Sequence, residues 1–234
     1  HDHAIRDVPH HREIVRDEQV REGELLLQAL QQLVGQSPWD WLPVWERLAK
    51  RMTAELAPDP AWVVDDTGFP KQGTHSVGVE RQYSGTLGKV GNCQVAVSLH
   101  HVGDQGYAIL GWRLYLPARW ATDPARRKAA GIPDAVVFKP KWHLGLDLID
   151  QARAWGLPDR LVVADAGYGD ATEFRDGLEA RHLAYVVGIA STVGVWIRPP
   201  KATVPPYEGR GAPPTRHAYG TQRPLSAQQA AAQA

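Results

Sequence analysis

The chain has 234 residues, of which 43% are hydrophobic and 22% charged, as in an ordinary soluble globular protein. No stretch of about twenty apolar residues occurs and the polar start has no signal-peptide pattern, so we expect neither a membrane span nor secretion. Cys93, the only cysteine, excludes an internal disulfide and favours a reducing, cytoplasmic environment.

The net charge is zero, with 26 Lys and Arg residues against 26 Asp and Glu residues, but the charges are unevenly distributed. Residues 1–60 carry 7 basic and 11 acidic side chains, whereas residues 67–145 carry 10 basic and 4 acidic ones. The second block could attract phosphate groups, because local potential steers polyanions more than net charge does. A solvated face of a neutral protein is the alternative, and charge alone leaves both open.

The N-terminal part, residues 1–60, reads as a helical module. Residues 12–34 become leucine-rich at helical spacing, and Ser37 and Pro38 have the residue types of an N-cap and first position of a second helix. We interpret the apolar residues near one face of that helix as a surface packed on the core. They are Trp39, Trp41, Leu42, Trp45 and Leu48.

Residues 61–197 change to a pattern of strands with interspersed helices. Residues 83–92 are Gly-rich and predict a loop, and residues 117–134 predict a Pro- and Arg-rich connection. The predicted strands are 61–64, 94–102, 107–116, 160–165 and 184–188, and the predicted helices are 140–155 and 170–181. This β-β-β-α-β-α-β order predicts an α/β fold with a mixed sheet flanked by helices.

Residues 198–234 form a Pro-rich tail. Seven prolines occur in residues 198–224, and residues 226–234 resemble the first turns of a helix that is cut off. We expect this tail to be extended, mobile or partly swapped onto a neighbouring molecule.

Two carboxylates follow predicted strands. Asp65 and Asp66 come after Val63 and Val64, and Asp165 comes after Ala164. If the two strands are neighbours, the acids can share divalent cations, because Mg²⁺ prefers hard oxygen ligands. Two such ions roughly 4 Å apart support phosphodiester transfer. Either motif alone is more typical of a turn or helix cap, but together they favour a metal site.

Four blocks of the sequence closely resemble DDE-superfamily transposases of bacterial insertion sequences. The blocks are 62–79, 81–94, 111–117 and 164–170, and the resemblance covers roughly residues 30–198. It implies an RNase H-like fold and three acids that bind two Mg²⁺ or Mn²⁺ ions. It also implies DNA as the partner (transposon ends and target), a homodimer in the active complex and a location in the bacterial cytoplasm.

The resemblance assigns two of the three acids. Asp65 matches the first acid, because the family has Thr at the second position after that acid. Asp66 is the reserve candidate for the first acid. Asp165 matches the second acid. The family's third acid is a Glu in the pattern Tyr-x-x-Arg-x-x-x-Glu. Tyr207 and its Arg fit that pattern, but Pro214 stands where Glu should be. We therefore expect the chain to stop before the third acid, inside an insertion, and to be inactive alone.

Lys71, His75, Arg81 and Lys89 follow the first acid and are candidates for phosphate contacts with DNA. A solvent-exposed loop that makes no DNA contact is the alternative interpretation.

Two functions from different classes fit these observations. The first is a DNA transposase catalytic core that carries out metal-dependent phosphodiester hydrolysis and strand transfer at insertion-sequence ends. The second is a non-catalytic DNA-binding, assembly or regulatory fragment of a transposase, and whether the chain is itself an enzyme stays open. A phosphatase with an Asp nucleophile is disfavoured, because the Asp-x-Asp-x-Thr pattern is missing around Asp65.

Overall fold

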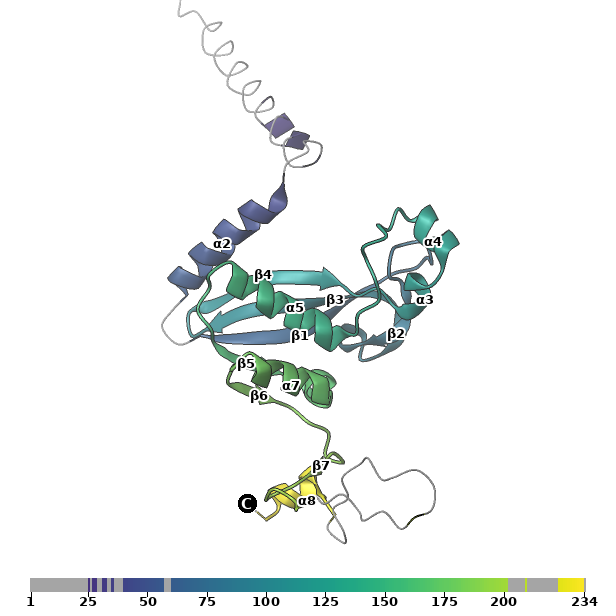
Figure 1. The fold of residues 1–234 in the computed structure, drawn as a ribbon. Coiled ribbons are helices and arrows are strands. Elements are labelled where there is room, and N and C mark those ends of the chain that lie inside the picture. The colour runs from purple at the N-terminus through teal and green to yellow at the C-terminus, as the bar shows by residue number, and fades with distance from the viewer. Residues whose placement is uncertain are drawn as a thin grey trace, which may run out of the picture. The chain divides into compact units, whose positions relative to one another are not determined.

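The computed structural model describes residues 40–56, 60–201 and 223–233, with Gly209 and six positions between residues 25 and 35. A mixed β-sheet forms its centre (Figure 1). Its strands are β1 (Ala61–Pro70), β2 (Glu80–Ser84), β3 (Lys89–Gly103), β4 (Gly106–Leu114), β5 (Leu161–Ala164) and β6 (Tyr185–Val187).

The strands run in the order β2-β3-β1-β5-β6, and β4 pairs with β3. Pairing is antiparallel among β1, β2, β3 and β4, and parallel from β1 to β5 and from β5 to β6. This topology confirms the RNase H-like mixed sheet that the resemblance implies. It also makes the strands that carry Asp65 and Asp165 direct neighbours.

One face of the sheet is covered by the helices α5 (Lys141–Ala154) and α7 (Thr172–Ala180), which contact each other (Figure 1). Alternate residues of β1 point to this face, so Trp62 and Val64 are buried in the main hydrophobic core. Gly145 allows α5 to approach β1 closely, because a Cβ there would lie 2.9 Å from Cγ1 of Val64. The remaining helical pieces are η1 (Gly85–Leu87), α3 (Ala118–Ala121), α4 (Pro124–Ala129) and α6 (Ala166–Gly169).

The Gly-rich segment 83–92 is not one loop, and here the sequence prediction is wrong. It contains the end of β2, the short helix η1 and the start of β3. The hydroxyl of Ser84 caps η1, and Gly88 ends it with a φ of 61°. The chain therefore reverses direction within η1 and Gly88. The residues on either side pair as strands, with Ser84 opposite Lys89.

Strand β1 is longer than predicted. It runs to Pro70 because its backbone pairs with β3 as far as Cys93. Asp65 and Asp66 consequently lie within this strand, and their side chains point to opposite faces of the sheet.

By its contacts the chain divides into two compact units, residues 1–44 and residues 45–234. The helix α2 (Trp41–Glu55) spans this boundary, and the start predicted for it at Ser37 and Pro38, like Trp39, lies outside the described residues. Within the second unit, Trp45 packs against the core and Ala49 and Thr53 are buried.

The residues of α2 that pack on the core thus follow i, i+4 spacing from Trp45 through Ala49 to Thr53. The prediction of a broader packed apolar face is wrong. Trp41, Leu42 and Leu48 are 47%, 42% and 54% exposed.

The last part of the Pro-rich tail is ordered. Strand β8 (Leu225–Ser226) pairs with β7 (Gly194–Val195) of the same chain and leads into α8 (Ala227–Ala231). Ser226 begins this helix with a capping box closed by Gln229. The expectation of an extended or swapped segment is therefore wrong for residues 225–231. In the described part of the chain, no helix has the length and apolar character needed to cross a membrane.

Candidate active site

Asp65 and Asp165 meet at neighbouring positions of the sheet. In the parallel pair β1–β5, Val64 lies opposite Ala164. Asp65 is the next residue of β1, and Asp165 directly follows the end of β5. Both line one cavity of about 530 Å³, together with Asp66. The three carboxylates that the sequence singled out thus line one cavity, together with Lys141 and Tyr168.

Asp65 is electrostatically crowded. Its Oδ1 accepts a hydrogen bond from the backbone N–H of Asp66 at 2.7 Å, and the Ser98 hydroxyl donates to its carbonyl oxygen at 3.3 Å. Burial raises the pKa of Asp65, and the charges of Asp66 and Asp165 raise it further, while the Asp66 N–H and His100 oppose the shift. A positive charge placed between these carboxylates would relieve this repulsion.

Asp66 already has a cationic partner. Nζ of Lys141, at the start of α5, donates to its Oδ2 at 2.7 Å, and the two side chains are only 32% and 21% exposed. Its charge is therefore compensated from the helical face of the sheet. This pairing distinguishes Asp66 from Asp65, a difference that their adjacent positions in the sequence do not reveal.

The Lys141–Asp66 pair should be worth more than a surface salt bridge. Lys141→Met leaves a half-buried carboxylate without its cation, and we expect a loss of about 1–2 kcal/mol in urea unfolding, between the values for exposed and buried pairs. Adding Asp66→Asn should recover most of this loss. Lys50→Met removes an exposed pair with Glu46, whose side chains are 50% and 36% exposed, and is the matched control. Equal losses in the two single variants would contradict the assignment.

Asp165 is held by the turn that follows β5. Its Oδ1 accepts from the backbone N–H of Gly167 at 2.9 Å and caps α6. Gly169 packs so closely on Gly188, after β6, that a Cβ would overlap the Gly188 carbonyl oxygen. Since Gly188 N–H in turn donates to Ala164 O at 2.9 Å, the backbone around Asp165 is fixed on both sides.

The residues present fit a hard divalent cation in part. Asp65 and Asp165 in one cavity lining supply oxygen ligands. Because Mg²⁺ keeps several waters, two acids and a phosphate oxygen can complete its shell. Among the residues that the structure describes, however, no three His, Cys, Asp or Glu side chains converge into a metal-binding group. The positions from Tyr207 to Pro214, where the third acid was sought, lie outside the described residues apart from Gly209.

Three residues near the acids were missed as site residues by the sequence analysis: His100, Lys141 and Tyr168. His100 Nε2 is 2.8 Å from the Ser98 hydroxyl oxygen. Burial lowers the pKa of His100, and the charge of Asp65 raises it by a smaller amount. No local pattern marks His100 or Lys141, because their positions depend on strand register and helix packing. Tyr168 lies in the block 164–170 that resembles the transposase family, but no role was predicted for it.

The four predicted DNA contacts lie outside the cavity lining. Lys71 follows β1, His75 lies in the loop after it, Arg81 is on β2 and Lys89 begins β3. All four are exposed. None of them is part of the cavity lining that contains the carboxylates.

The connection between β4 and α5 packs against the loop that carries His75. The Trp120 indole donates to Val79 O at 2.9 Å, and Arg126 stacks on Trp120 and donates to Thr74 O at 3.1 Å. This segment contains two short helices, α3 and α4, which the sequence analysis treated as irregular connection.

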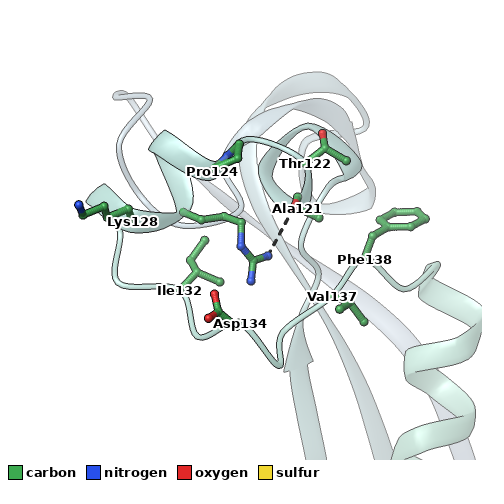
Figure 2. Close-up of a pocket in the computed structure, with 9 residues that line it drawn as sticks. Ala121, Thr122, Pro124, Lys128, Ile132, Asp134, Val137 and Phe138 are labelled. Carbon is green, nitrogen blue, oxygen red and sulfur yellow. Dashed lines mark hydrogen bonds between the residues drawn. The ribbon is translucent and has the colours of Figure 1, made fainter.

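A larger cavity, of about 780 Å³, lies within that connection, with Ile132, Val137 and Phe138 in its wall (Figure 2). Arg127 holds this wall together by donating to the carbonyl oxygens of Pro133 and Val136, each at 2.8 Å. Because its guanidinium is used internally, Arg127 supports the fold of the connection, whereas the neighbouring Lys128 is exposed.

Comparison with known proteins gives two findings. Residues 18–234 match the family model described as DDE superfamily endonuclease. The probable transposase for insertion sequence element IS701 of Microchaete diplosiphon is 31% identical over 174 residues. That match covers 74% of this chain and 43% of the relative, so the chain spans less than half of the relative's length.

Proposed function

Because the chain belongs to the DDE superfamily of endonucleases, we propose that it carries the catalytic core of an insertion-sequence transposase that cuts and joins DNA. The observation that carries this proposal is that Asp65 and Asp165, each one residue beyond the last β1–β5 pair, line the same cavity. The relative in Microchaete diplosiphon, named as a probable transposase, points the same way. DNA, at transposon ends and targets, is the proposed partner, with a homodimer as the active assembly and the bacterial cytoplasm as its location.

Asp65 and Asp165 are the proposed ligands of Mg²⁺ or Mn²⁺. Such ions, when bound, activate an attacking oxygen and stabilise a leaving one at a phosphodiester. Asp66 is the weaker candidate, because Lys141 already holds it. The ammonium group of Lys141, at the cavity wall, is suited to attract a DNA phosphate into the recess.

A crystal of the chain soaked in Mn²⁺ tests this proposal by anomalous scattering. We expect a peak within ligand distance of both Asp65 and Asp165, with Asp66 still paired to Lys141. Metal on other residues, or none at a concentration that stabilises the protein against heat, would overturn the assignment.

The exposed cations Lys71, Arg81 and Lys89 should make DNA binding depend on salt. Single Lys71→Ala, Arg81→Ala and Lys89→Ala variants should each weaken duplex binding for all sequences and reduce the slope of log K against log salt by about 1. Fluorescence anisotropy over a salt series measures both quantities. Lys50→Ala removes the same charge from α2 and should leave the slope unchanged. If it has the same effect as the other three, the interface lies elsewhere.

A further inference from the structure

Tyr168 occupies a position that its hydroxyl group does not explain. It lies on α6, is 2% exposed, and packs its ring on Phe174 with centroids 5.6 Å apart. On the side of α5, the ring fills the space left by Gly145, where a Cβ would lie 3.6 Å from a ring carbon. All of these ring contacts would be available to phenylalanine.

The Tyr168 hydroxyl is buried, and within the described part of the chain it has no hydrogen-bond partner. Burying a hydroxyl without a partner is unfavourable relative to leaving it in water. The fold therefore keeps a polar atom that destabilises it, at a residue that lines the same cavity as Asp65 and Asp165. Such an atom is expected where a ligand supplies the missing partner.

The hydroxyl stays protonated in this setting. Burial raises the pKa of Tyr168 far above its usual range, and the charges of Asp66, Asp65 and Asp165 act in the same direction. A neutral phenol can donate one hydrogen bond.

The cavity thus combines two kinds of group. Asp65 and Asp165 offer negative oxygens for cations, while Lys141 and Tyr168 offer donors for an anion. A DNA phosphodiester brings anionic oxygens that match the donors and can share the cations with the carboxylates.

We propose that the Tyr168 hydroxyl donates a hydrogen bond to a phosphate oxygen of DNA held beside Asp65 and Asp165. This inference rests on the proposed function, and it identifies Tyr168 as a binding residue for the phosphate. The test uses Tyr168→Phe, which retains the ring, and Tyr107→Phe as the matched control, since Tyr107 lies on β4 outside the cavity lining and is 70% exposed.

The measurement is the affinity of the chain for a short fluorescent DNA duplex, in Mg²⁺ and in EDTA, combined with thermal unfolding. We expect wild type to bind more tightly in Mg²⁺, and Tyr168→Phe to lose about tenfold in affinity in Mg²⁺, as for a hydrogen bond to a charged group. Its unfolding temperature should be unchanged or higher, because an unpaired buried hydroxyl has been removed. Tyr107→Phe should match wild type in both.

The outcomes separate the inference from the proposed function. A Mg²⁺-dependent gain that Asp65→Asn abolishes and Tyr168→Phe leaves intact would overturn the role of Tyr168 alone. A lower unfolding temperature in Tyr168→Phe, with a parallel loss of affinity in EDTA, would show a structural role and also overturn it. If wild type gains nothing from Mg²⁺, and Asp65→Asn changes nothing, both proposals fail.

Discussion

Asp65→Asn should remove the stabilisation of the chain by Mn²⁺. At a concentration of about one hundred times its Kd, a bound ion adds about 2.7 kcal/mol, or roughly 5–10 °C in Tm for a chain of this size. The loss of a direct carboxylate ligand should exceed the 10–100-fold loss of metal affinity typical of removing an outer partner. Thermal scans with and without Mn²⁺ measure this effect, and wherever wild type cleaves DNA the variant should not.

Without metal, the same substitution should have the opposite effect on the stability of the fold. The pKa of Asp65 is raised in the folded chain, chiefly by burial, so its protonated form is the one that favours folding. That contribution is complete below the unfolded pKa of about 3.9 and is lost as the pH rises through the folded pKa. Asn resembles the protonated form. We therefore expect apo Asp65→Asn to be at least as stable as wild type at neutral pH, with this advantage disappearing in acid.

Asp165→Asn should behave like Asp65→Asn toward Mn²⁺ while retaining its turn, because Asn caps helices as well as Asp does. Asp104→Asn, in the exposed turn between β3 and β4, is the matched control and should change neither property. Full Mn²⁺ stabilisation in both Asp65→Asn and Asp165→Asn would remove the basis for the metal site.

The meeting of Asp65 and Asp165 could be predicted from sequence because it depends on local patterns. Each acid follows a short apolar run of residues, and the strand order of the fold makes β1 and β5 neighbours in parallel. Parallel neighbours bring the residues after these two runs together, although β1 itself continues to Pro70. Short-range pattern and topology were sufficient here.

The rest of the site depends on tertiary packing. Lys141 reaches Asp66 from 75 residues away in the sequence, and its contact requires α5 to lie close on β1 at Gly145. The opposite orientations of Asp65 and Asp66 became clear only from the pairing of β1 with β3, since an acid pair before Thr and Gly resembles a turn. The buried hydroxyl of Tyr168 likewise has no signature in sequence.

Gly169→Ala should be among the most destabilising single substitutions in this chain. A Cβ at Gly169 would overlap the carbonyl oxygen of Gly188 and lie 3.0 Å from both its carbonyl carbon and the Cβ of Val187. The first two atoms belong to the backbone after β6, so no side-chain rotation relieves the overlap. We expect a loss of about 3 kcal/mol, at the upper end for overpacked sites, and roughly 6–12 °C in Tm.

The same substitution should weaken Mn²⁺ binding, because the displaced backbone supports Asp165. Gly169 N–H donates to Asp165 O at 2.8 Å, and Gly188 N–H donates to Ala164 O at 2.9 Å, so movement at their contact reaches the second acid directly. Gly73→Ala, where a Cβ meets nothing within 4 Å, controls for the loss of glycine entropy and should be neutral or slightly stabilising. Wild-type Tm and Mn²⁺ affinity in Gly169→Ala would mean that this contact does not hold Asp165 in place.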